Sequence, residues 1–290
     1  MSHLLSPAEV FPAGVPDISA RYVKLSTGVR LRVVESGPQS GRPVVMLHGW
    51  GASAYMYRQA LTLLPARGLR AIAVDLRGYG LSDKPSDRRA YTLEAYCADI
   101  GALLDALALP VVALIGQSMG GGIALHYALE NAARLSRLVL VNPVGLVSIS
   151  YLPILRLLPR SAIDIFGRRL MPRVGVDFIL RYVAYGDPSL PTERDVDEYW
   201  APTQLPGFVS AARAALSEFD WEPVSSIDAA SLAVPAVVIL GTKDRLIRNA
   251  GPAARRLRGA TVHSIDGGHC VLEENPGPVY RIAGDFLSAN

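Results

Sequence analysis

Apolar residues occur along the chain in two patterns: short, nearly unbroken runs, and longer segments in which they return every three or four positions. A strand buried on both faces of a parallel sheet has the first pattern, because helices pack against it from both sides. The alternation of the two patterns predicts an α/β fold, with a mostly parallel central sheet covered by helices on both faces. The unbroken runs are residues 44–47, 71–74, 111–115, 138–141 and 236–240.

Residues 18–25 and 29–35 alternate partly between polar and apolar positions, and Thr27-Gly28 separates them. This pattern predicts an opening β-hairpin. After Thr92, apolar side chains return at helical spacing, and Thr92 itself is a suitable N-cap. Cys97 lies on the apolar stripe of this helix, so we expect its thiol to be in the core.

The strand rhythm stops after Asn142-Pro143 and resumes near residue 234, with short helical patterns and repeated prolines between. Because a structureless loop of about 80 residues is improbable in a compact protein, we predict a helical cap inserted after the sixth strand. We expect residues 1–145 and 228–290 to form the core and residues 146–227 the cap. The first half of the cap is basic, and we interpret it as a solvated outer surface. Its basic residues are Arg156, Arg160, Arg168, Arg169, Arg173 and Arg181.

The predicted strand at 111–115 runs directly into a glycine-flanked serine, Gly116-Gln117-Ser118-Met119-Gly120, and a helical pattern follows. A serine hydroxyl is a weak nucleophile unless it is held rigidly beside a base. A tight strand-to-helix turn holds it so, but strains its backbone and leaves room only for small residues two positions before and after. The N–H groups at the start of the helix also point toward the reacting oxygen. We therefore predict Ser118 as the nucleophile.

Two further polar residues follow predicted strands. Asp244 comes after the strand at 236–240, and His269 comes after a strand predicted at 261–265. The carboxyl ends of parallel strands meet at one edge of a sheet, so we expect both side chains to lie near Ser118. In such a triad His269 is the general base, and Asp244 orients its imidazole and stabilises the charged form.

Other candidates for these roles have simpler interpretations. Asp266 competes with Asp244, but it lies just before His269 and is interpreted as a turn residue at a strand end. His3 lies near the terminus, His126 within a predicted helix and His263 within a predicted strand.

The segment His48-Gly49-Trp50-Gly51 follows the strand at 44–47. With this segment and the serine turn, the chain resembles the lid-bearing α/β-hydrolases, from about Tyr22 to Phe286. That family includes carboxylesterases, perhydrolases, carbon–carbon bond hydrolases, epoxide hydrolases and haloalkane dehalogenases. The resemblance implies the chain order serine, acid, histidine, and an oxyanion hole formed by the backbone N–H groups of Trp50 and Met119.

The resemblance also bears on neighbouring residues. Some relatives carry the acid after the sixth strand, where this chain has Asn142-Pro143, and Asp244 is thus left as the acid. We interpret His48 as a structural hydrogen-bonding residue. The Trp50 indole has two interpretations, as the floor of the acyl pocket or as a core residue.

The identity of the predicted nucleophile limits the reactions that we expect. Haloalkane dehalogenases and epoxide hydrolases form their ester on an aspartate, whereas Ser118 suits attack on an acyl carbon. We predict hydrolysis of carboxylic esters with uncharged, short-to-medium acyl chains, because the cap begins with an apolar segment. Carbon–carbon bond hydrolysis and cofactor-free perhydrolysis on the same triad are alternatives. Many carbon–carbon bond hydrolases have an aromatic residue where this chain has Cys270, and this difference makes carbon–carbon bond hydrolysis the weaker alternative. A third alternative is a ligand receptor that does not turn over its ligand.

Composition restricts the partners. With 50% hydrophobic and 19% charged residues the chain is typical of a globular protein. The net charge is only +3, and the sequence has no basic run interleaved with aromatic residues, so we expect no nucleic-acid partner. We also expect no membrane span, cofactor or metal, and a small-molecule ester as the partner. A start without a signal-peptide pattern, and two cysteines interpreted as free thiols, predict a soluble cytoplasmic protein.

Overall fold

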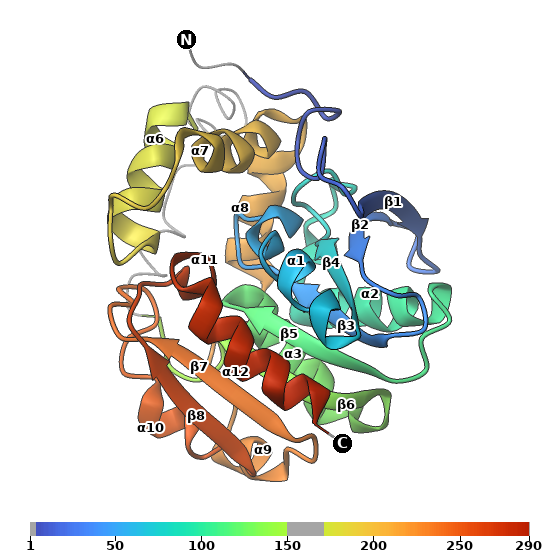
Figure 1. Cartoon of the computed structure of the whole chain (residues 1–290), viewed down its shortest axis with the longest axis vertical. Coiled ribbons are helices and arrows are strands. Elements are labelled where there is room, and N and C mark those ends of the chain that lie inside the picture. The colour runs from blue at the N-terminus through green and yellow to red at the C-terminus, as the bar shows by residue number, and fades with distance from the viewer. Residues whose placement is uncertain (1–3, 150–170, 290) are drawn as a thin grey trace.

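The computed structural model describes residues 4–149 and 171–289 (Figure 1). Its centre is an eight-stranded sheet with the order β1-β2-β4-β3-β5-β6-β7-β8. β2 is antiparallel to β1 and β4, and the remaining neighbours are parallel, which confirms the mostly parallel sheet and the opening hairpin. The strands are β1 (Ile18–Lys24), β2 (Arg30–Ser36), β3 (Arg42–Leu47), β4 (Leu69–Asp75), β5 (Val112–Gln117), β6 (Leu135–Val141), β7 (Ala236–Gly241) and β8 (Ala260–Ile265).

Alternate side chains of the central strands enter two hydrophobic cores, one on each face of the sheet. Val45 and Leu47 of β3 belong to one core, and Val44 and Met46 to the other. Helices α2 and α3 cover the first face, while α1, α11 and α12 cover the second (Figure 1). The helices that come before the cap and after α8 are α1 (Ala60–Leu63), α2 (Leu93–Ala106), α3 (Met119–Glu130), α9 (Ser226–Ser231), α10 (Gly251–Ala254), α11 (Val271–Glu274) and α12 (Pro276–Ser288).

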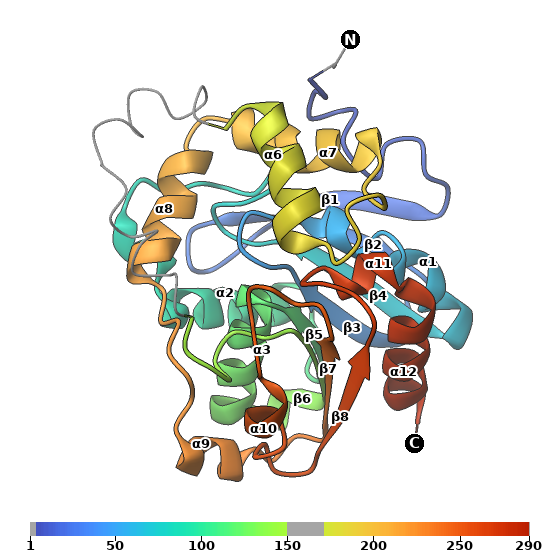
Figure 2. The ribbon, with the colours of Figure 1, turned by 90° about the vertical axis from the view of Figure 1, so that its left-hand side faces the viewer.

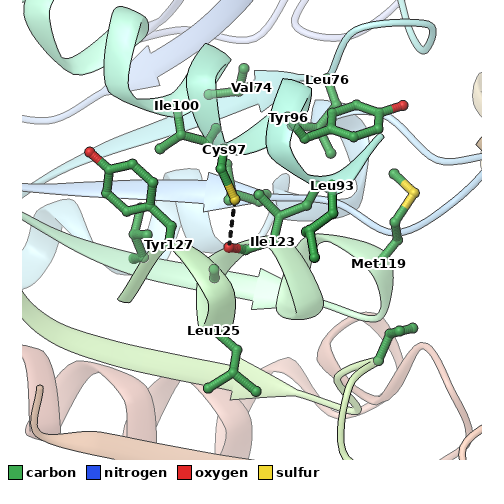
Figure 3. Close-up of a cluster of buried hydrophobic side chains, with 14 of the residues drawn as sticks. Val74, Leu76, Leu93, Tyr96, Cys97, Ile100, Met119, Ile123, Leu125 and Tyr127 are labelled. Atoms are coloured by element: carbon green, nitrogen blue, oxygen red, sulfur yellow. Dashed lines mark hydrogen bonds between the residues drawn. The ribbon is translucent and has the colours of Figure 1, made fainter. Parts of the chain in front are cut away.

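Helix α2 begins as the sequence predicts. The Thr92 hydroxyl accepts a hydrogen bond from the Ala95 N–H (3.2 Å), which is the bond expected of an N-cap. Cys97 is buried between α2 and α3, and its thiol donates to the carbonyl of Ile123 at 3.8 Å (Figure 3). The prediction that Cys97 is a core residue is therefore confirmed.

The described part of the segment between β6 and β7 contains several helices joined by turns. Figure 2 shows α6 and α7 above the end of the sheet to which the arrowhead of β8 points. The chain leaves and re-enters the core at one place, where the Val224 N–H donates to the Gly145 carbonyl at 2.9 Å. This closure supports residues 146–227 as the cap, a boundary that we keep as a proposal. The elements are α6 (Arg173–Ile179), the π-helical η5 (Leu180–Ala184), α7 (Glu193–Trp200), η6 (Ala201–Gln204) and α8 (Phe208–Glu218).

The cap shares its hydrophobic packing with the core. Leu180 and Ala184 belong to the same cluster as α1, α11 and α12, whereas Phe208 and Ala211 of α8 belong to the cluster of α2 and α3. No helix in the described ranges is long and apolar enough to span a membrane.

The basic residues of the cap are described only in part. Arg173 pairs with Asp197 at 2.6 Å, and Arg181 pairs with Asp177 at 2.7 Å. Both arginine side chains are 20% exposed in these pairs, and the interpretation of the basic half of the cap as a solvated surface stays a prediction. The residues outside the described ranges are Arg156, Arg160, Arg168 and Arg169.

Candidate active site

Ser118 lies at the junction of β5 and α3, with a backbone φ of +52° and ψ of −118°. Residues other than glycine rarely adopt this conformation, so the surrounding structure must hold it in place. Three backbone hydrogen bonds do so. The Ser118 N–H donates to Val141 O (3.1 Å), and its carbonyl accepts from the N–H groups of Gly122 (3.0 Å) and Val144 (2.9 Å).

The glycines on either side of Ser118 are required by close backbone contacts. A Cβ at Gly116 would lie 2.7 Å from the Cα of Gly121, and a Cβ at Gly120 would lie 2.6 Å from the carbonyl oxygen of His48. Such approaches are too short for any side chain. This is the steric reason that the sequence analysis gives for small residues at these positions.

His269 and Asp244 form a direct pair. His269 Nδ1 lies 2.8 Å from Asp244 Oδ2, and the two side chains are 9% and 2% exposed. The other carboxylate oxygen of Asp244 accepts from the N–H groups of Leu246 (2.7 Å) and Ile247 (3.0 Å). A proton on Nδ1 leaves Nε2 as the proton acceptor, which is the tautomer that a general base needs.

Two buried amides tie the histidine loop to the serine turn, and sequence reasoning missed both. Gln117 Nε2 donates to the His269 carbonyl at 3.0 Å, and so does Asn142 Nδ2 at 3.0 Å. Asn142 Oδ1 accepts from the Gly241 N–H at 2.8 Å, at the end of β7. The loops of Ser118, His269 and Asp244 therefore meet in one hydrogen-bond network.

Ser118 and His269 are brought to the same edge of the sheet but are not hydrogen-bonded to each other. Among the described residues, no bond joins Ser118 Oγ to a ring nitrogen of His269. Hydrogen bonds between a nucleophile and its base are often long in the absence of substrate and tighten when it binds.

The turn after β3 lies against Ser118. A Cβ at Gly49 would lie 3.1 Å from the Cβ of Ser118, so the backbone leading to Trp50 passes beside the serine. Trp50 is 37% exposed, and its indole N–H donates to the carbonyl of Ala212 in α8 at 2.8 Å. The indole therefore links this turn to the cap and is not a buried core residue.

His48 is fully buried, and both of its ring nitrogens have partners. Nε2 accepts from the Leu76 N–H at 3.0 Å, and Nδ1 lies 2.7 Å from the Gly49 carbonyl, to which it donates. Burial lowers the pKa of His48, so the ring is neutral near pH 7. These contacts agree with its interpretation as a structural residue.

The remaining candidates that the structure describes make no hydrogen bond or ion pair with His269 or Asp244. Asp266 is exposed and pairs with Lys243 at 2.9 Å, a contact that lowers the pKa of this carboxylate. His126 is half-buried in α3 and His263 is half-buried in β8. His3 lies outside the described residues. Within the described ranges, no group of three or more His, Cys, Asp and Glu side chains is placed to bind a metal ion.

The two cysteines are expected to be unreactive in the folded protein. Both are buried, and burial raises the pKa of Cys97 to about 12 and that of Cys270 well above its usual range. Because the thiolate is the reactive form, iodoacetamide at about pH 8 should leave both unmodified until urea is added. Intact-mass measurement follows the modification. Rapid labelling of Cys270 in the native protein would show that this side chain is accessible and ionised.

The sheet order, the serine turn after β5 and the histidine–aspartate pair define an α/β hydrolase. The family model of the alpha/beta hydrolase fold matches residues 42–276, and the chain belongs to this family. Family membership supports a hydrolase activity.

Relatives within the family differ in their named activities. The chain is 32% identical over 272 residues to a non-heme chloroperoxidase of Streptomyces lividans, covering 88% of this chain and 94% of the relative. Among solved structures, an epoxide hydrolase matches with a TM-score of 0.79, at 24% identity over 93% of this chain and 98% of its own. An esterase from Exiguobacterium antarcticum matches with a TM-score of 0.77, at 22% identity over 93% of this chain and 100% of its own. These two structures show the fold alone.

Proposed function

We propose that the protein hydrolyses carboxylic esters through an acyl-enzyme on Ser118. The observation that carries this proposal is the 2.8 Å contact of His269 Nδ1 with Asp244 Oδ2, in a loop that Gln117 ties to the serine turn. A serine, a histidine in the correct tautomer and a buried carboxylate are the groups that acyl transfer requires.

In the proposed reaction, His269 Nε2 removes the proton of Ser118 as Oγ attacks the ester carbonyl. The negative oxygen that forms is stabilised by the backbone N–H groups of Trp50 and Met119. His269 then gives its proton to the leaving alcohol. Water attacks the acyl-enzyme in the same way and releases the acid, while Asp244 stabilises the imidazolium in both steps.

The proposed substrate is an uncharged ester with a short-to-medium acyl chain. Leu146 and Ile149, at the start of the cap, are buried and belong to the apolar core. An acyl site that the cap lines with such side chains would favour an acyl group without charge, because a charged group would lose its hydration there.

The substrate class is tested with the nitrophenyl esters of acetate, butyrate, octanoate and laurate, and with a charged succinate ester as control. We expect turnover of the uncharged esters that peaks at butyrate or octanoate. A fluorophosphonate should inactivate the protein and add its mass to the peptide that contains Ser118. Absence of both turnover and adduct would contradict the proposal and favour a ligand receptor.

Perhydrolysis is the second candidate, because the relative named non-heme chloroperoxidase matches most of the chain. Hydrogen peroxide that attacks the acyl-enzyme in place of water gives a peracid and restores the Ser118 hydroxyl. Bromination of a dye by peroxide, bromide and acetate tests this reaction. Bromination faster than ester hydrolysis would favour the perhydrolase. An adduct on Ser118 without either activity would favour carbon–carbon bond hydrolysis.

A further inference from the structure

Glu274, at the end of α11, connects the histidine loop to the cap. Its Oε1 accepts a hydrogen bond from the Gly268 N–H at 2.7 Å, directly before His269. Its Oε2 accepts from the N–H groups of Gly186 (2.8 Å) and Asp187 (3.4 Å), which follow the π-helical segment of the cap. One side chain therefore binds two backbone segments that are far apart in the sequence.

The two segments also touch directly. A Cβ at Gly268 would lie 2.6 Å from the carbonyl carbon of Tyr185, and a Cβ at Gly186 would lie 2.8 Å from the Gly268 nitrogen. The Cys270 N–H donates to the Ala184 carbonyl at 3.1 Å. The backbones of the cap and of the histidine loop thus pack at a distance that only glycine allows.

The loop of the acid is attached to the same part of the cap. Arg245 follows Asp244, and its Nη1 donates to the carbonyls of Tyr182 (2.6 Å) and Tyr185 (3.4 Å). Residues 182–187 of the cap therefore contact the loops of both His269 and Asp244.

The chemistry of the Glu274 side chain suits this double contact. An ionised carboxylate only accepts hydrogen bonds, so each of its oxygens can face a backbone N–H. Burial raises the pKa of Glu274, and the hydrogen bonds from Gly186, Gly268 and Asp187 oppose that rise. A glutamine has one accepting oxygen, and its amide N–H group would face a backbone N–H on one of the two sides.

We propose that Glu274 is a positioning residue of the triad, which fixes the His269 loop against residues 182–187 of the cap. The cap in this proposal holds the base in place as well as covering the substrate. The proposal rests on the proposed role of His269 as general base.

The test is Glu274→Gln, assayed as the full chain on the best nitrophenyl ester. We expect kcat to fall by up to about 100-fold, since small displacements of a catalytic group have effects of this size. KM should stay within about two-fold, because the variant does not touch the acyl site. Hydrogen exchange of residues 265–270, followed by mass spectrometry, should become faster.

The matched control is Glu198→Gln. Glu198 is a buried carboxylate in α7 of the cap, and like Glu274 it accepts a hydrogen bond from a backbone N–H, that of Phe11 at 2.8 Å, but it does not contact the histidine loop. This variant should keep the kcat of the wild type and the slow exchange of residues 265–270, even where its melting temperature is lower. An equal loss of kcat in both variants would overturn the positioning role and indicate a general effect of cap stability.

Gly186→Ala tests the same contact from the cap and keeps Glu274 in place. Its methyl group would press on the Gly268 nitrogen, so we expect the same loss of kcat and the same faster exchange. Normal kcat in folded Glu274→Gln or Gly186→Ala would overturn the proposal. The exchange measurement needs no substrate, so it tests the contact between Glu274 and the histidine loop independently of the proposed function. The proposed function itself would be contradicted if Ser118 stayed unmodified after fluorophosphonate treatment.

Discussion

Ser118→Ala is expected to lower kcat for ester hydrolysis by about 10⁶-fold, because the acyl-enzyme cannot form without the hydroxyl. The residual rate would come from substrate binding and from the proposed oxyanion donors, which the substitution leaves in place. We expect the fold to be unchanged, since the backbone bonds of residue 118 to Val141, Gly122 and Val144 do not involve the side chain. Steady-state hydrolysis and a thermal melt check the two expectations.

Ser136→Ala is the matched control for this loss. Ser136 is an exposed serine in β6, near the amino end of the strand and remote from the histidine–aspartate pair. Its replacement should leave kcat unchanged. Appreciable turnover by a purified Ser118→Ala protein would show that another residue is the nucleophile.

Asp244→Asn is expected to lower kcat by about 10⁴-fold while the fold stays intact. The asparagine oxygen can still accept from the N–H groups of Leu246 and Ile247, so the loop keeps its hydrogen bonds. The amide nitrogen then faces His269 Nδ1 and donates to it. This places the imidazole proton on Nε2, which can no longer accept the serine proton.

Asp266→Asn tests whether Asp244 or Asp266 is the acid of the proposed triad. Asp266 is exposed and contacts Lys243 and Thr242, so its replacement should change kcat by less than about two-fold. The comparison uses initial rates on one ester at one pH. A large loss in Asp266→Asn with normal turnover in Asp244→Asn would reverse the assignment of the acid.

The central strands of the sheet could be predicted from the sequence because they are buried on both faces. The apolar run at 44–47 lies within β3 and the run at 138–141 lies within β6, and both runs are buried along their whole length. The helix start at Thr92 was predictable as well, because an N-cap contact joins residues that are neighbours in the chain. The serine turn has a local signature for the same reason.

The contacts that hold the site together could not be predicted. Gln117 and Asn142 donate to the carbonyl of His269, more than a hundred positions away in the chain. A bond from a side chain to a distant backbone group leaves no periodicity or spacing in the sequence. The same holds for the bond that Glu274 accepts from the Gly186 N–H, and for the Trp50 indole, whose partner is a carbonyl of α8.

The hydrogen bond between Val224 and Gly145 has a consequence for how enzymes of this architecture diversify. A segment whose two ends adjoin can be exchanged, lengthened or shortened during evolution without separating the strands on either side of it. The glycine contact between residues 186 and 268 limits that freedom, because a transplanted cap must bring a turn that fits the recipient's histidine loop. Chimaeras in which the cap and the segment 267–274 come from one parent are therefore expected to retain more turnover than chimaeras that exchange the cap alone.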